Sequence, residues 1–256
     1  MPENAKTGWL RVVGLGPGDA AMLTPEASQA LETASDVLGY TTYLDRVPHR
    51  PGQVRFATDN REELDRARHA LTLAAQGCQV ALVSGGDPGV FAMASAVFEA
   101  MEHGLPAWRA LDVAVIPGIS AMFAAAARLG APLGHDFCAI SLSDNLKPWA
   151  LIERRLRLAA QAGFVMALYN PRSKARPDQL AQGFAILRAE LPPDVPVAFA
   201  RAVGSAQERI HLTTLEEADP ALVCMRTLVL IGTAGTRLVP RPQGGAFVYT
   251  SRSASA

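Results

Sequence analysis

The sequence predicts an α/β protein of two lobes, with mostly parallel sheets that helices cover on both faces. Short β-branched or apolar runs alternate with longer segments of helical periodicity along most of the 256 residues. Several short runs end in glycine-rich turns, and open α/β sheets bind ligands at the carboxyl ends of their strands. We therefore expect a first lobe at residues 1–118, a second at 119–240, and a flexible Gly/Ser/Arg-rich tail at 241–256.

The first lobe contains clear helix-start signals between its apolar runs. Thr24 followed by Pro25 is typical of an N-cap and the first helical residue. Asn60 and Glu63 have capping-box spacing, and Gly77 can end the helix that follows. The expected strands are 9–13, 36–38, 80–83 and 112–116, and the expected helices are 25–34, 60–76 and 92–101.

The second lobe shows the same alternation of apolar runs and helical segments. An alanine-rich segment at 121–129 predicts its first helix. The expected strands are 138–142, 164–168, 195–200, 209–213 and 227–231, with further helices at 148–161 and 179–190.

Composition excludes several functional classes. The 24 basic and 24 acidic residues balance, so no overall field attracts nucleic acid or an anionic membrane. The longest apolar-rich stretch, 110–127, is interrupted by Asp112 and Pro117, so no membrane span is expected. Three widely spaced cysteines without metal-ligand spacing, and no secretory signal, predict a reduced cytoplasmic protein without a metal.

The most informative loop follows the predicted strand 80–83. Gly85 and Gly86 expose the backbone at the strand end, since no Cβ hinders the approach of a ligand. Asp87 then adds a negative charge that a phosphate-binding loop would avoid. The loop suits a ligand with hydroxyls, amines or positive charge, although a plain glycine-rich connection is the alternative.

A second glycine loop, at residues 14–19, follows the first predicted strand. Its GxGxG pattern suggests a dinucleotide fingerprint, but Pro17 is inserted and Asp19 closes the turn. The usual acidic ribose partner would be Asp36, which begins the next strand instead of ending it. We favour a substrate-facing loop that presents Asp19, with a structural turn or a dinucleotide site as alternatives.

Other strand ends also carry small or charged residues. The turn at 116–121 leads into a helix. The small residues at 199–204 and 230–235 could form the wall of a nucleoside pocket, although core packing would explain either segment in isolation. The loop at 168–176 holds three cations that could bind substrate carboxylates or simply be solvated.

The order of these motifs resembles that of the tetrapyrrole methylases, the class III S-adenosylmethionine-dependent methyltransferases, over residues 9–237. Residues 39–44 and 169–173 resemble in particular the branch that methylates precorrin-3B at C17 with ring contraction in cobalamin biosynthesis. The family often has Thr where this chain has Ser120, and many members have Met near Asn170 and Asn-Gly-Thr at 201–203. These departures fit a corrinoid-branch member.

The resemblance implies a two-lobed homodimer that folds S-adenosylmethionine between its lobes and releases S-adenosylhomocysteine. The implied donor-binding residues are Gly85, Gly86, Asp87, Val90, Ser120, Ala121, Asn170, Ala202 and Gly232. The implied substrate-binding residues, for precorrin-3B, are Gly16, Pro17, Gly18, Tyr40, Thr41, Arg172 and Arg201. No metal is implied.

Ring contraction requires a base to remove a hydroxyl proton. Asp19 is the leading candidate, ahead of Asp144, His135 and Glu208. Because the substrate carries many carboxylates, further cations are candidate clamps: Arg46, His49, Arg50 and Lys174.

Three other functions remain open. A methylase of this fold could act on a different precorrin or uroporphyrinogen carbon, a modified protein histidine or ribosomal RNA. A dinucleotide-dependent oxidoreductase is a different class, which Pro17 and Asp19 disfavour. A non-catalytic corrinoid carrier would not need a second, donor-sized pocket.

Overall fold

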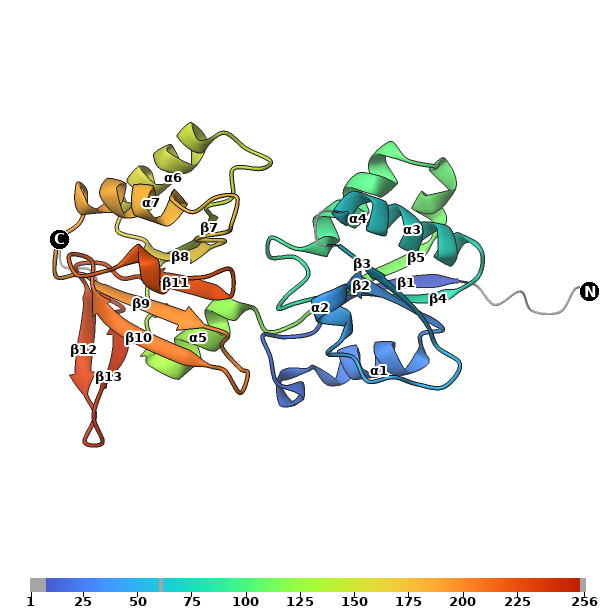
Figure 1. Ribbon diagram of the computed structural model, residues 1–256, viewed down its shortest axis with the longest axis horizontal. Coiled ribbons are helices and arrows are strands. Elements are labelled where there is room, and N and C mark those ends of the chain that lie inside the picture. The colour runs from blue at the N-terminus through green and yellow to red at the C-terminus, as the bar shows by residue number, and fades with distance from the viewer. Residues whose placement is uncertain (1–7, 60–61, 254–256) are drawn as a thin grey trace, which may run out of the picture. The chain divides into compact units, whose positions relative to one another are not determined.

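The computed structural model describes residues 8–59 and 62–253, which divide into two units at Met1–Ser120 and Ala121–Ala256 (Figure 1). The division falls two residues after the expected lobe boundary at 118. Asn60, the first residue of the expected capping box, lies outside the described residues, and the helix that follows begins at Glu63.

A five-stranded sheet in the order β3-β2-β4-β1-β5 forms the centre of the first unit, and all its neighbouring strands are parallel. Parallel pairing places the carboxyl ends of all five strands at one edge, where the predicted glycine loops emerge. The strands are β1 (Trp9–Gly14), β2 (Asp36–Tyr40), β3 (Val54–Thr58), β4 (Gln79–Ser84) and β5 (Asp112–Ile116).

Helices cover both faces of this sheet (Figure 1). On β4, Val80 and Leu82 pack beneath α3 and α4, whereas Ala81 and Val83 face α1. This alternation is the side-chain period of a strand that is buried on both faces. The helical elements are η1 (Ala20–Met22), α1 (Pro25–Thr33), α2 (Thr41–Leu44), α3 (Glu63–Ala75), α4 (Met93–His103) and η2 (Pro106–Ala110).

The second unit contains a five-stranded mixed sheet in the order β10-β9-β11-β8-β7. Only β7 and β8 pair in parallel in this sheet, while β11 runs antiparallel to both β8 and β9. Parallel pairing still predominates over the described chain as a whole, as expected. The strands are β7 (Phe137–Ser141), β8 (Val165–Tyr169), β9 (Pro196–Arg201), β10 (Arg209–Thr214) and β11 (Thr227–Ile231).

The helices of the second unit divide between the two faces of its sheet. One face packs on α6 and α7 around the fully buried Phe184, and the other packs on α5. The helical elements are α5 (Ala121–Leu129), α6 (Trp149–Gln161), α7 (Gln179–Arg188) and η3 (Pro220–Leu222). No helix within the described ranges is long and apolar enough to cross a bilayer.

The expectation of a flexible tail at 241–256 is wrong for the part of that segment that forms a strand. Residues Ala246–Thr250 form β13, which pairs with β12 (Thr236–Pro240) and with the two-residue β6 (Gly130–Ala131). Val248 is buried in the α5 core, and the Thr250 hydroxyl donates to the carbonyl of Pro132 at 2.6 Å. The Gly/Ser-rich composition of the tail favoured a prediction of loop, although two side chains of this short strand face inward.

We expect Val248→Ala to lower the free energy of unfolding by about 2 kcal/mol, because it leaves a cavity among buried apolar side chains. The matched control is Val239→Ala on β12, where the side chain is 46% exposed; its effect should stay within ~0.5 kcal/mol. Chemical denaturation measures both variants. Equal, small effects would mean that the hairpin contributes nothing to the fold.

Candidate active site

Three glycine loops meet at the carboxyl edge of the first sheet. The backbones of Gly16 and Gly86 exchange two hydrogen bonds, with N–H to O=C distances of 3.1 and 2.9 Å. A Cβ on Gly118 would lie 2.2 Å from the carbonyl oxygen of Gly86, and one on Gly14 would lie 2.6 Å from the amide of Gly118. These contacts require glycine, so the loops after β1, β4 and β5 form one packed group.

Asp87 ties two of these loops together. One carboxylate oxygen accepts the Gly89 amide at 2.8 Å, and the other accepts the Gly118 amide at 3.1 Å. Hydrogen bonds from amides to an ionised carboxylate are among the stronger ones in proteins. The carboxylate thus fixes the 85–90 loop against the turn that follows β5, as well as placing negative charge at this edge.

Asp19 is exposed on the neighbouring loop. Its Oδ1 accepts the amide of Ala21 at 2.8 Å and caps the short helix η1. Gly16 adopts a φ of +65°, which a glycine tolerates without strain. The loop therefore holds the Asp19 carboxylate in a defined, solvent-accessible position, with Pro17 and Gly18 beside it.

Arg46, expected from the sequence as a substrate clamp, instead holds this loop from within the unit. One terminal nitrogen of its guanidinium lies 2.7, 3.0 and 3.1 Å from the carbonyl oxygens of Leu15, Gly16 and Gly18. Burial lowers the pKa of Arg46 from its ordinary value. The sequence could not predict this role, because every residue has a backbone carbonyl and no sequence pattern shows which of them an arginine binds.

Tyr40 and Thr41 lie at the end of β2 and the start of α2. The Thr41 hydroxyl donates to the carbonyl of Thr58 at 3.2 Å, and the Tyr40 ring meets that of Tyr43 edge to face at 5.5 Å. A Cβ on Gly85 would lie 2.6 Å from the Tyr43 ring, so this tyrosine packs directly on the 85–90 loop. Burial raises the pKa of Tyr43, which keeps the phenol neutral.

In the second unit, Asn170 and Ala202 follow β8 and β9 with left-handed backbones. Their φ angles are 52° and 49°, values that non-glycine residues seldom adopt. The Asn170 side chain donates to the Ser141 hydroxyl at 2.9 Å, and the Ala202 carbonyl accepts the Ser205 hydroxyl at 2.8 Å. Such strain is found most often at functional sites.

The start of helix α5 lies beside Tyr169. The Tyr169 hydroxyl oxygen accepts the amide of Met122 at 3.2 Å, which satisfies one of the free N–H groups of the first helical turn. Ala121 begins this helix, and Ser120, which precedes it, is buried. The second unit thus brings Ala121, Asn170 and Ala202 to the edge at which β7, β8 and β9 end.

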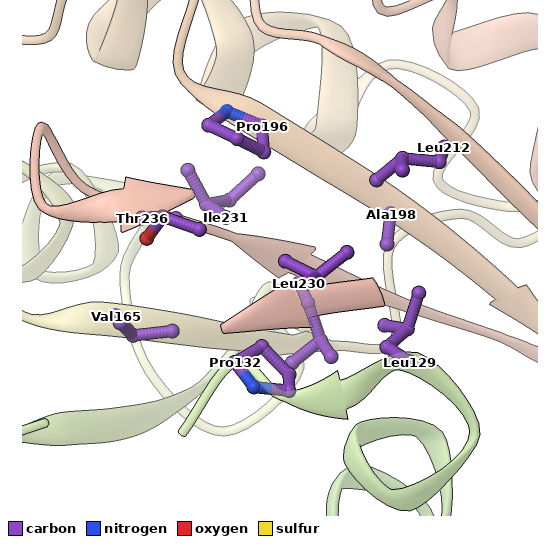
Figure 2. Close-up of a pocket in the computed structure, with 11 residues that line it drawn as sticks. Leu129, Pro132, Val165, Pro196, Ala198, Leu212, Leu230, Ile231 and Thr236 are labelled. Atoms are coloured by element: carbon purple, nitrogen blue, oxygen red, sulfur yellow. The ribbon is translucent and has the colours of Figure 1, made fainter. Parts of the chain in front are cut away.

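The structure does not bring Gly232 to that edge. Because β11 is antiparallel to its neighbours, Ile231 pairs with Met166 and Val197, so Gly232 lies at the opposite end of the sheet. An apolar cavity of about 10 Å³ adjoins Gly232 there (Figure 2), room for roughly one water. An adenosyl group does not fit this space.

Thr227, at the other end of β11, lies at the edge at which β9 ends. It pairs with Arg201 on β9, is buried, and accepts the Cys224 amide at 3.1 Å. A correct strand direction would have identified it, because the start of an antiparallel strand shares an edge with the ends of its neighbours.

The candidate cations and weaker bases occupy different environments. Arg50 pairs with Glu32 at 3.0 Å, and Arg176 lies 3.7 Å from Asp144. Glu208 pairs with Arg128 and also accepts the Gly204 amide at 2.7 Å, which gives this carboxylate a structural role. Arg201 and Lys174 are exposed, and Arg172 is half-buried.

Asp87→Ala should weaken binding of S-adenosylhomocysteine, the ligand that the resemblance implies, by at least about tenfold while the protein still folds. The loss of two hydrogen-bond acceptors costs about 1–3 kcal/mol of stability, less than the usual 5–15 kcal/mol total. Calorimetry and thermal denaturation measure the two effects.

The matched control is Asp87→Asn, which keeps one acceptor oxygen and the shape of the side chain. It should fall between the wild type and the alanine variant in both measurements. Unchanged affinity in Asp87→Ala would remove this residue from the site. Unchanged stability would show that the hydrogen bonds of Asp87 to Gly89 and Gly118 do not stabilise the loops.

Comparison with known proteins agrees with these motifs. The model of the family Tetrapyrrole (Corrin/Porphyrin) Methylases matches residues 10–219. The chain is 58% identical to a precorrin-3B C(17)-methyltransferase of a Sinorhizobium species, over 96% of this chain and 97% of that protein. It is 44% identical to a probable cobalt-factor III C(17)-methyltransferase of Salmonella typhimurium, over 89% and 93%.

A solved structure is also similar to this chain. The crystal structure of the methyltransferase CobJ is 53% identical and superposes with a TM-score of 0.91, covering 95% of this chain and all of that one (100%). The expected α/β fold and the resemblance first seen in the glycine motifs are confirmed. This chain belongs to the tetrapyrrole methylase family.

Proposed function

We propose that this protein is an S-adenosylmethionine-dependent methyltransferase that methylates C17 of precorrin-3B in cobalamin biosynthesis. The observation that carries the proposal is the 58% identity with a precorrin-3B C(17)-methyltransferase over 97% of that protein's length. The motif segments 39–44 and 169–173, which resemble that branch of the family, support the same substrate.

The polar and small groups at the edge of the second sheet fit a nucleoside-bearing donor. Asn170 offers an amide and Thr227 offers a hydroxyl. Ala202 offers a small side chain on a backbone with a positive φ. We assign the donor to Ser120, Ala121, Asn170 and Ala202, with Thr227 in place of Gly232, and to the loop that contains Gly85, Gly86, Asp87 and Val90.

S-adenosylmethionine supplies a methyl group on a sulfonium, whose positive charge disperses as the methyl is transferred to a ring carbon. The task of the chain is alignment and exclusion of water, which together can lower a barrier by several kcal/mol. Loops that are hydrogen-bonded in advance, as Gly16 is to Gly86, suit this task because they need not reorganise when the ligands bind.

The loop at residues 14–19 and the start of α2 face the macrocycle in this proposal. Pro17 and Gly18 present backbone to its flat face, the buried Gly16 holds them in place through its hydrogen bonds with Gly86, and Tyr40 and Thr41 contact its rim. Arg172 and Arg201 hold peripheral carboxylates, since a guanidinium binds a carboxylate through two parallel hydrogen bonds.

Asp19 is the proposed base for ring contraction. Its exposed carboxylate accepts the proton of a ring hydroxyl as that oxygen becomes a carbonyl. The adjacent carbon–carbon bond then migrates and displaces the lactone oxygen, which leaves as a carboxylate. The capping hydrogen bond from Ala21 uses one oxygen of Asp19 and orients the side chain for this transfer.

The protein is further proposed to act as a cytoplasmic homodimer, as the resemblance implies. Its three cysteines are free thiols, in keeping with a reducing compartment. Sedimentation velocity should give about twice the chain mass of 27.1 kDa. A single species at the chain mass would contradict the dimer.

Incubation with precorrin-3B and methyl-labelled S-adenosylmethionine tests the function directly. We expect one added methyl and a changed chromophore, as formation of precorrin-4 requires. Methylation without a skeletal change would leave the enzyme class intact and contradict ring contraction.

Parallel incubations separate the competing functions. Faster turnover of cobalt-factor III, favoured by the 44% identity with the Salmonella typhimurium protein, would reassign the substrate to the cobalt-containing series. Calorimetric binding of NADPH instead of S-adenosylhomocysteine would indicate an oxidoreductase. Tetrapyrrole binding without methyl turnover would indicate a carrier.

A further inference from the structure

A titratable side chain at the edge of the first sheet has no part in the reaction proposed above. Tyr43 lies in the short helix α2, and its half-buried ring packs against the core between the sheet and α1. A Cβ on Gly85 would lie 2.6 Å from Cε1 and 2.8 Å from Cζ of this ring. Because Cζ carries the hydroxyl, the polar end of Tyr43 lies against the backbone of the 85–90 loop.

The Tyr43 hydroxyl forms no hydrogen bond with the part of the chain that the structure describes. A tyrosine hydroxyl usually has a partner where its ring is packed into a protein. The buried side-chain atoms that lack a partner include Nε of Arg46 but not this hydroxyl, so the oxygen is open to a ligand. Tyr43 therefore presents an available hydrogen-bond donor beside the glycine loops.

The surroundings of Tyr43 keep this donor protonated and in place. Burial raises the pKa of the phenol, and the positive charge of Arg46 lowers it by a smaller amount. The Tyr40 ring meets the Tyr43 ring edge to face at 5.5 Å. Arg55 donates to the carbonyl of Leu44, the last residue of α2, at 2.5 Å. The phenol is thus a neutral donor on a restrained element.

Tyr43 also neighbours the two loops to which the proposed function assigns the ligands. Its ring packs on Gly85, in the loop assigned to the methyl donor. Arg46, which lies close enough to Tyr43 to change its pKa, donates to carbonyl oxygens of the loop at 14–19. That loop carries Asp19, the proposed base.

We propose that Tyr43 is a catalytic residue of ring contraction, in which its hydroxyl donates a hydrogen bond to the lactone oxygen as the bond from that oxygen to the ring breaks. This inference rests on the proposed function. Asp19 takes the proton of the ring hydroxyl, and the electron pair of that O–H bond forms the new carbonyl. The adjacent carbon–carbon bond migrates with its electron pair. The pair of the broken carbon–oxygen bond stays on the lactone oxygen, which becomes a carboxylate.

Ring contraction needs such a donor, whereas methyl transfer does not. Negative charge develops on the lactone oxygen, and a donor placed there stabilises the transition state more than the ground state. Methyl transfer disperses the positive charge of a sulfonium and creates no anion. Tyr43 keeps its proton throughout, because a carboxylate, with a pKa of about 4, is a much weaker base than a phenolate, with a pKa of about 10.

Tyr43→Phe is the decisive variant, because it removes the hydroxyl and keeps the ring that packs on Gly85. Its Tm and its Kd for S-adenosylhomocysteine should match those of the wild type, since the hydroxyl binds no described protein atom. The rate of precorrin-4 formation should fall roughly a hundredfold, the usual effect of removing one donor to a developing oxyanion. Tyr249→Phe is the matched control, since Tyr249 is 40% exposed on β13, and it should match the wild type throughout.

A single-turnover incubation with precorrin-3B and methyl-labelled S-adenosylmethionine separates the two steps. In Tyr43→Phe the label should enter the macrocycle at about the wild-type rate, while the chromophore change that marks contraction should lag behind it. A purely structural role of the hydroxyl would instead lower the Tm or slow both steps together.

Four outcomes count against Tyr43 as this donor. Unchanged precorrin-4 formation in Tyr43→Phe would show that the hydroxyl takes no part in the reaction. A raised Kd for S-adenosylhomocysteine would assign the hydroxyl to the methyl donor, and a lowered Tm or an equal slowing of both steps would make it structural. Failure of the wild type to convert precorrin-3B would reject the proposed function as well, and so differs from a failure limited to the variant.

Discussion

The hydrogen bonds of the Asp87 carboxylate are the interaction on which the first unit's site depends. The sheet brings the ends of β1, β4 and β5 to one edge, but it does not fix the loops that follow them. Asp87 connects its own loop to the Gly118 amide, and the Gly16–Gly86 pair connects the third. Loops that are far apart in the sequence, such as those of Gly16 and Gly118, are thus joined into one surface.

The close packing of these three loops also explains why the motifs have glycine at particular positions. Gly14 and Gly118 are needed for close approach, since any Cβ there would collide with backbone atoms of the neighbouring loop. Gly16 and Gly86 are needed for their positive φ angles. Glycine therefore serves two different purposes within this group of loops. Arg46 supports the group from inside by donating to the carbonyl oxygens of Leu15, Gly16 and Gly18.

Local patterns predicted the strand ends and glycine loops, because apolar runs and turn residues act over a few positions. Long-range geometry escaped prediction. The partner of Asp87 is 31 residues away. The antiparallel direction of β11, which places Thr227 and not Gly232 beside the end of β9, depends on pairing with distant strands. The strand at Ala246–Thr250 was hidden because its Gly/Ser-rich surroundings favour loops, while only Val248 and Thr250 point inward.

The two units use different means to restrain the edges at which we propose that the ligands bind. The first uses glycines, which adopt unusual conformations freely and are then fixed by hydrogen bonds between loops. The second uses Asn170 and Ala202, which have strained backbones. The Asn170 side chain donates to the Ser141 hydroxyl, and the Ala202 carbonyl accepts the Ser205 hydroxyl. In both units the restraint comes from the protein itself and precedes any ligand. A reaction that needs alignment more than acid–base power benefits from this, because the cost of ordering the site is met during folding and not during each turnover.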